Sequence, residues 1–112
     1  MQGMDITDVQ AALVRIQAQA QTATVDFTLH AQQEMVEEAM SSDEILQAVA
    51  IGQILENYPT HQRGACCLLY GRTEQGRHLH LVCTTACSTL IVITVYEPRQ
   101  PKWITPTQRR AL

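Results

Sequence analysis

Two histidines stand two positions apart in the segment Arg77–Val82, where polar and apolar residues alternate. In a β-strand this alternation sends His78 and His80 to one face of a sheet and the leucines that follow each of them to the other face. Imidazole exchanges protons close to neutral pH, so it is the side chain best suited to acid–base chemistry there. The spacing therefore predicts one sheet face that carries two proton-transfer groups.

Arginines flank these histidines. If Thr73–Gly76 forms a four-residue hairpin loop, Arg72 pairs with Arg77 at the rim of the sheet. The same loop length predicts two further cross-strand pairs, Leu69 with His80 and Cys66 with Cys83. The hairpin would thus place a basic rim beside the histidines.

A metal centre is the first alternative to acid–base chemistry, because His78, His80, Cys83 and Cys87 lie within ten positions of one another. The spacing is poor for zinc, since the two histidines face away from Cys83 and no Cys-x-x-Cys motif is present. In a chain without an export signal, the four cysteines are expected to be reduced thiols that fill core volume. The five glycines form no nucleotide-binding loop, so we expect neither a metal nor a cofactor.

Composition sets the frame for any function. A chain of 112 residues with 46% apolar residues can bury the core of one domain. Its net charge of −3 disfavours the binding of a nucleic-acid phosphate backbone on average. However, nine of the eleven Asp and Glu residues precede Pro59. From His61 onward seven cations face two carboxylates, so the C-terminal half is locally basic. We expect Trp103 to anchor an irregular tail in which Arg109 and Arg110 are solvated.

The N-terminus has no basic region followed by an apolar stretch, and no window is apolar for long enough to span a membrane. These features predict a cytoplasmic protein without a membrane partner.

Three helices are predicted in the first half. The first runs from Asp5, its cap, to about Thr22, with Ile6, Val9, Leu13 and Ile16 on one face. The second runs from the N-cap Thr28 to Met40 and buries Ala31, Met35 and Ala39, with Val36 alongside. The third follows a capping box formed by Ser41 and Glu44, and it ends before Gly52.

Four short β-rich runs follow, at Gln53–Tyr58 and at residues 65–71, 77–84 and 89–96. Their short connections predict an antiparallel meander, so the fold class is α+β, with two to three helices packed on a four-stranded antiparallel sheet. Leu90–Val95 is apolar at every position but one, which predicts a strand covered on both faces. Whether Tyr96 joins the histidine face depends on a loop of four or five residues around Thr85–Ser88.

The ordered set of a helix-start His-Ala, a Glu-x-Tyr-Pro, a strand His and a Thr-Val-Tyr-x-Pro resembles the family called domain of unknown function 4258. These motifs lie in Phe27–Ala31, Gly52–Pro59, Arg77–Val82 and Ile93–Pro98, and Met35, Ser42–Ile45 and Trp103 add to the resemblance. That family is distantly similar to the RelE-like and BrnT-like ribonuclease toxins, and some members are encoded beside zinc-finger antitoxins. The resemblance covers about residues 25–104 and implies a RelE-like α+β domain there. The helical extension at residues 1–24 and the tail at 105–112 lie outside it.

The resemblance also implies an activity, the metal-independent cleavage of RNA by an endoribonuclease of a toxin–antitoxin system. A general base would take the proton of a 2′-hydroxyl and a general acid would protonate the leaving oxygen. The implied catalytic residues are His30, His80, Glu56 and Tyr96. The implied substrate-binding residues are Arg63, Arg72, Arg77, His78 and Tyr58. The implied partners are RNA and an antitoxin protein. A second copy of the chain is a further partner considered, because it could cover the second face of the Leu90–Val95 strand.

One departure from the family pattern bears on this activity. The family often has Glu-Arg-Gly at the end of the helix that begins with His-Ala, and Glu37-Glu38-Ala39 stands here, without the basic residue. The alternative is a non-catalytic protein-interaction domain of the same fold, a degenerate toxin relative in which His30 bonds a backbone group or packs on the sheet. The net charge favours the alternative. The presence of His30, Glu56, His80 and Tyr96 at motif positions favours the nuclease.

Overall fold

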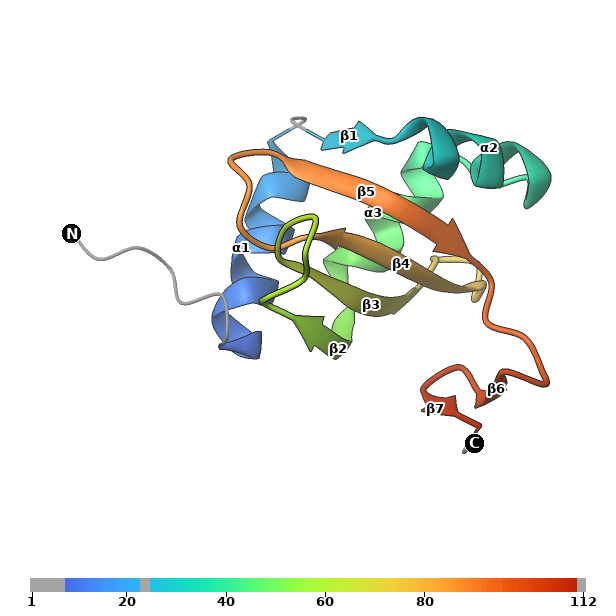
Figure 1. Ribbon diagram of the computed structural model, residues 1–112. Helices are drawn as coiled ribbons and strands as arrows, with labels where there is room; N and C mark the ends of the chain where they lie inside the picture. The colour runs from blue at the N-terminus through green and yellow to red at the C-terminus, as the bar shows by residue number, and fades with distance from the viewer. Residues whose placement is uncertain (1–7, 23–24, 111–112) are drawn as a thin grey trace.

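The computed structural model describes residues 8–22 and 25–110, and helices and strands are mixed along the chain (Figure 1). In chain order the elements are α1 Val9–Gln21, β1 Val25–Phe27, α2 Leu29–Glu37, α3 Ser42–Ala50, β2 Gln53–Tyr58, β3 Cys66–Arg72, β4 His78–Thr84, β5 Leu90–Tyr96, β6 Trp103–Thr105 and β7 Gln108–Arg109. A five-stranded sheet has the order β1-β5-β4-β3-β2, and β6 and β7 form a separate two-stranded ribbon. The predicted α+β class is confirmed.

The large sheet is mixed, so the predicted four-stranded antiparallel sheet was incomplete. Strands β2 to β5 do form an antiparallel meander, but β1 joins it as a fifth strand that runs parallel to β5. The backbone N–H of Thr28, just after β1, donates to the carbonyl of Val92 at 3.0 Å. A three-residue strand is too short to show a period, so its pairing with a distant strand had no signal in the sequence.

The register between β3 and β4 is shifted by one residue from the register predicted for a four-residue loop at Thr73–Gly76. The loop contains five residues, Thr73 to Arg77, because the N–H of Thr73 donates to the carbonyl of Arg77 at 2.9 Å and Gly76 adopts a φ of +87°. Arg72 therefore pairs with His78. The same shift pairs Tyr70 with His80 and Cys67 with Cys83.

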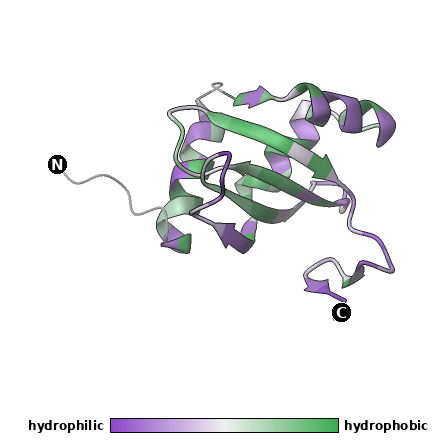
Figure 2. Ribbon diagram, viewed as in Figure 1, coloured by the Kyte–Doolittle hydropathy of each residue, from purple (hydrophilic) through white to green (hydrophobic). Residues whose placement is uncertain are grey.

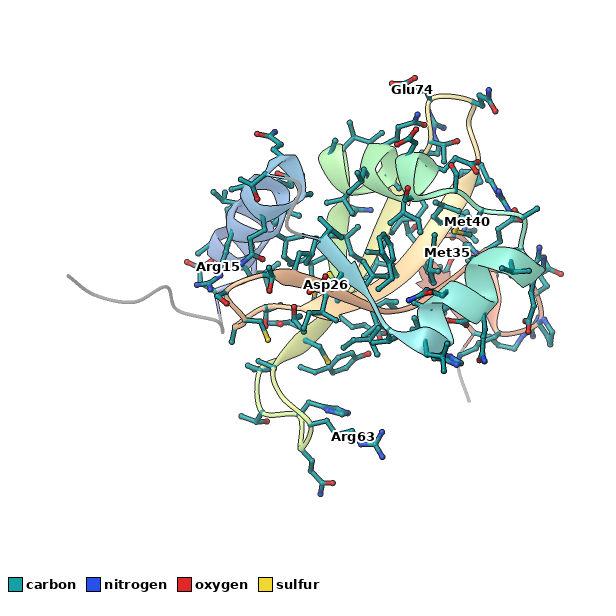
Figure 3. All side chains as sticks on the ribbon, turned by 90° about the horizontal axis from the view of Figure 1, so that it is seen from above. Arg15, Asp26, Met35, Met40, Arg63 and Glu74 are labelled. Atoms are coloured by element: carbon teal, nitrogen blue, oxygen red, sulfur yellow. The ribbon has the colours of Figure 1, made fainter. Side chains whose placement is uncertain are left out.

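Helix α1 begins after Asp8, whose carboxylate accepts from the N–H groups of Gln10 and Ala11. The predicted cap Asp5 and the apolar Ile6 lie outside the described residues. Ile16 is fully buried in the same core as the sheet, so α1 packs into the domain. Figure 3 shows α1 and α3 on one side of the sheet, and the loop with Arg63 projects on the other.

Helix α2 begins at the predicted N-cap, since the Thr28 hydroxyl accepts from the N–H of Ala31 at 3.0 Å. It ends at Glu37, earlier than predicted. The N–H of Met40 donates to the carbonyl of Met35 and that of Ala39 to the carbonyl of Val36, which is a Schellman motif. Ala39 takes the left-handed position of this motif, with a φ of +50°. Of the residues predicted to be buried on this helix, Ala31 is buried, Met35 is partly buried and Ala39 is exposed, and Val36 beside them is 82% exposed.

Helix α3 has the predicted capping box. The Ser41 hydroxyl accepts from the N–H of Glu44, and the Glu44 carboxylate accepts from the N–H of Ser41. The helix lies very close to β3, because a Cβ built on Gly71 would come within 1.9 Å of the carbonyl oxygen of Ala48. Only glycine fits at this crossing.

The core lies between the sheet and the helices and contains Ile16, Ala31, Ile45, Val49, Leu69, Leu81, Val92 and Val95. Figure 2 shows this apolar character along β3, β4 and β5. Cys67 and Cys83 contribute to the core as free thiols with their sulfur atoms 3.9 Å apart, in keeping with the space-filling role expected of them. In the parts of the chain that the structure describes, no helix is both long and apolar enough to cross a membrane.

Candidate functional site

The sheet face away from α1 and α3 carries most of the polar and aromatic residues that the sequence singled out. Cross-strand pairing places His80 between Tyr70 on β3 and Tyr96 on β5. Directly paired residues point to the same face, so this register resolves the open question about Tyr96. On β2 an irregularity between Ile54 and Glu56 sets Glu56 opposite Leu68 on the same face.

His80 is fully buried at 0% exposure, and both of its ring nitrogens are bonded. Nε2 lies 2.5 Å from the carbonyl oxygen of Pro106, and Nδ1 lies 3.2 Å from the hydroxyl of Tyr96. A carbonyl can only accept, so Nε2 carries the hydrogen and Nδ1 accepts from Tyr96. Burial lowers the pKa of His80, because a charged imidazole would lose its hydration. The fold therefore selects one neutral tautomer.

The β6–β7 pair, here called the C-terminal ribbon (residues 103–109), covers His80. The indole of Trp103 is 3% exposed and meets the His80 ring edge-on, with 4.3 Å between ring centroids. The carbonyl of Pro106 comes from the turn of the ribbon. Trp103 does anchor the end of the chain, as expected.

Arg109 joins the ribbon to β2. Its Nε and Nη2 donate to the two carboxylate oxygens of Glu56 at 3.0 and 2.9 Å, and its guanidinium lies 4.6 Å from the centroid of the Trp103 ring. The bonds from Arg109 lower the pKa of Glu56, so this carboxylate is ionised at neutral pH. Arg109 was expected in a solvated tail, and the structure shows that it is still exposed, with 40% of its side-chain surface accessible, but ion-paired with Glu56.

Two further tyrosines extend this cluster. The Tyr58 hydroxyl donates to Glu56, and burial together with that carboxylate raises the pKa of Tyr58 to about 12. The Tyr70 hydroxyl lies 2.7 Å from Nδ1 of His78, and the two rings stack with centroids 5.8 Å apart. Burial also raises the pKa of Tyr96, so Tyr58 and Tyr96 hold their protons at neutral pH.

His30 lies at the margin of this face, on α2. Its Nε2 is 3.3 Å from a carboxylate oxygen of Glu34, which also accepts from the N–H of Val95 at 3.0 Å and from the hydroxyl of Thr94. Thr94 precedes Tyr96 by two residues on β5, a step of about 7 Å along a strand. In the described parts of the chain His30 thus contacts Glu34 and makes no contact with His80.

Among the described residues, none of the three arginines predicted to hold phosphate bonds to Glu56 or His80, the polar groups that Arg109 and Pro106 contact. Arg77 donates to Glu97 at 2.7 Å, to Glu44 at 3.3 Å and to the carbonyls of Glu38 and Ala39, so it ties the β3–β4 loop to the α2–α3 junction. Arg63 is exposed in the loop after β2 (Figure 3), and Arg72 is exposed at the end of β3.

Arg109 is the cation that the sequence analysis missed. The strand-like Trp103-Ile104-Thr105, followed by Pro106 and Thr107, is a short hairpin signal that points to it.

The described residues form two larger cavities, of which one adjoins the site. The first, of about 530 Å³, lies between α2 and α3, is lined in part by Met35, Val36 and Met40, and includes no residue of the cluster around His80. The second, of about 410 Å³, lies beside the C-terminal ribbon and is lined by Pro101, Lys102, Arg109 and Arg110. Across residues 8–22 and 25–110, no three His, Cys, Asp or Glu side chains are placed to hold a metal ion.

An α+β domain with a mixed five-stranded sheet and a buried histidine–tyrosine cluster is the class of protein that these observations define. The chain belongs to the family described as a domain of unknown function (DUF4258), whose model matches residues 27–97. The predicted family is confirmed, whereas the likeness to RelE-like and BrnT-like toxins stays a prediction. A search of curated proteins and a search of solved structures returned no match to this chain.

Proposed function

We propose that the chain is a metal-independent endoribonuclease of the RelE-like toxin class that acts at the cluster around His80. The observation that carries the proposal is the convergence of Glu56, Tyr58, His80, Tyr96 and Arg109 from four elements of the fold. Groups whose pKa values are shifted in opposite directions gather where proton transfer takes place. Here burial lowers the pKa of His80, while the pKa of Tyr58 rises to about 12.

The tautomer of His80 suits it to the role of a base that acts through Tyr96. Nδ1 already accepts the hydrogen of the Tyr96 hydroxyl. When that hydroxyl takes the proton of a ribose 2′-hydroxyl, it passes its own proton to Nδ1, so no free tyrosinate forms. Tyr96 is then the group that touches the substrate, and the buried His80 acts through it.

The remaining groups complete the reaction. The 2′-oxygen attacks phosphorus, the bond from phosphorus to the 5′-oxygen breaks, and Tyr58 protonates that leaving oxygen. The extra proton on Nδ1 of His80 then returns through Tyr96 and solvent to Tyr58, which restores the resting state. The products are a 2′,3′-cyclic phosphate and a free 5′-hydroxyl. Arg109 stabilises the charge that develops on the phosphate, and its bond to Glu56 orients its guanidinium.

A cleavage assay tests the proposal. Purified full chain is incubated with RNA, free and on ribosomes, in EDTA, and formation of 2′,3′-cyclic phosphate ends is measured. We expect Tyr96→Phe to lower the rate at least about 100-fold, the scale of general acid–base catalysis. Tyr70→Phe is the matched control, since it removes a hydroxyl from the same face without touching Nδ1 of His80. Wild-type protein that cleaves no RNA under either condition would contradict the proposal.

One observation favours the second candidate, a non-catalytic interaction domain. His80 has no exposed surface, and its two hydrogen bonds are complete within the chain. A satisfied buried histidine needs no substrate to explain it. In this case the exposed parts of the same face would bind an antitoxin-like protein or a second copy of the chain. Expression alone in bacteria separates the candidates, because the nuclease should arrest growth and His80→Gln should relieve the arrest.

A further inference from the structure

We infer that the pocket lined by Pro101, Lys102, Arg109 and Arg110, here called the cationic pocket, binds one nucleotide of an RNA strand. The inference rests on the proposed function and replaces the phosphate contacts that the sequence analysis assigned to Arg63, Arg72 and Arg77.

The charges of the pocket point to an anion. Arg77, Arg99 and Arg109 are ion-paired with glutamates. Lys102 and Arg110 form no ion pair with any residue that the structure describes, although they are held together by the bond from the N–H of Arg110 to the carbonyl of Lys102 at 2.8 Å. Two uncompensated cations on one pocket attract a group with concentrated negative charge, such as a phosphate.

The apolar lining and the volume of the pocket indicate that the anion it binds is a nucleotide. Nε of Arg110 donates to the carbonyl of Pro101 at 2.7 Å, which fixes the side chain and leaves its terminal nitrogens to bind a ligand. Pro101 and the aliphatic stems of the long cationic side chains provide apolar surface beneath the charges. A volume of about 410 Å³ is in the range of small-ligand sites. A nucleotide fits both the apolar surface and the cations, because its planar base can lie on the apolar surface while its phosphate binds Lys102 and Arg110.

The cationic pocket adjoins the proposed reaction site. Arg109 belongs to both, because it lines the pocket and bonds Glu56. The charges of Arg109 and Lys102 also act on His80, where they add to the effect of burial in lowering its pKa. A nucleotide in the pocket therefore places the next phosphate of the strand toward Tyr96 and Tyr58.

Binding can be measured apart from cleavage with a fluorescent 2′-O-methyl RNA 12-mer, which lacks the attacking hydroxyl. For the full chain we expect Lys102→Ala/Arg110→Ala to weaken binding by about 10- to 100-fold. The slope of log Kd against the logarithm of the salt concentration should also fall by about two, one for each cation removed. The matched control is Arg63→Ala/Arg72→Ala, which removes the same charge outside the pocket. Equal weakening by both double variants would show a general charge effect and overturn the inference.

A second titration with 5′-AMP distinguishes an RNA strand from a free nucleotide. If 5′-AMP binds in a way that depends on Lys102 and Arg110 and the 12-mer does not bind, the pocket is a nucleotide site. That result would overturn its assignment to RNA. Binding of the 12-mer at the pocket without any cleavage of natural RNA would support the pocket and contradict only the nuclease proposal. Failure to bind either probe would overturn the pocket.

Discussion

Tyr96 lies directly opposite His80 on the neighbouring strand, and its hydroxyl is 3.2 Å from Nδ1 of the imidazole. On the other side of the ring, the carbonyl of Pro106 accepts from Nε2. In the resting protein, a proton taken from solvent onto Nδ1 while Tyr96 keeps its own would break the bond between the two groups and leave an unhydrated charge under Trp103. The resting fold therefore holds His80 neutral.

Stability should depend on pH through His80. Its pKa is lowered from 6.5 by burial in the folded chain, while the unfolded chain keeps the ordinary value. Above pH 6.5 both states hold the ring neutral and stability is complete. Below it the unfolded chain binds a proton first, so the free energy of unfolding falls until the folded-state pKa is reached. Urea unfolding between about pH 7.5 and 5 measures this loss.

The control for this titration is His80→Gln, which should give a flatter pH profile above the acid range. The lowered pKa values of Glu38, Glu44 and Glu56 act below their ordinary 4.5, outside this window. A profile for His80→Gln as steep as that of the wild type would assign the pH dependence to other groups.

Arg109→Ala should loosen the C-terminal ribbon. Trp103 is the only tryptophan, so its fluorescence reports on the ribbon directly. Without the bonds to Glu56 and the guanidinium on the indole, we expect water to reach Trp103 and its emission to move to longer wavelength. Arg63→Ala should leave the emission unchanged. An unchanged spectrum in Arg109→Ala would mean that other contacts suffice to hold the ribbon.

Ala39→Gly should stabilise the fold by about 0.5–1 kcal/mol, because glycine adopts the left-handed conformation that alanine adopts here at a cost. The same exchange at Ala18, an exposed position inside α1, should destabilise by about 1 kcal/mol. Urea midpoints of the two variants provide the comparison. A loss of stability in both would show that the backbone at Ala39 is not strained.

Gly71→Ala should destabilise the fold by about 3 kcal/mol or more, since overpacking is costly and the added methyl would overlap the backbone of Ala48. Gly76→Ala meets no atom within 4 Å and suffers only from its positive φ, so its cost should be near 1 kcal/mol. Thermal unfolding of both variants tests the difference. Similar losses would mean that α3 can move away from β3.

The predictions from the sequence succeeded where the signal was local. The caps at Thr28 and at Ser41 with Glu44 depend on residues within three positions of each other, and strands β2 to β5 showed their own β-rich composition. The β3–β4 register depended on one loop residue, Arg77, and the pairing of β1 with β5 joins segments about 65 positions apart.

The candidate site was predicted only in part, for the same reason. Alternation placed His78 and His80 on one face, and the family resemblance pointed to Glu56 and Tyr96. The contacts of Arg109 and Pro106 arise when a short ribbon folds back over the sheet, and no periodicity near these residues encodes the segment that they meet.

The family match stops at residue 97, before Trp103, Pro106 and Arg109. A fragment trimmed to the matched segment would keep every histidine but lose the acceptor for Nε2 of His80 and the cation on Glu56. It would also lose Ile16, whose removal leaves a hole in the core. The imidazole of His80 would then face bulk solvent and titrate as an ordinary imidazole. Experiments on such a fragment would therefore describe chemistry that the intact chain does not have.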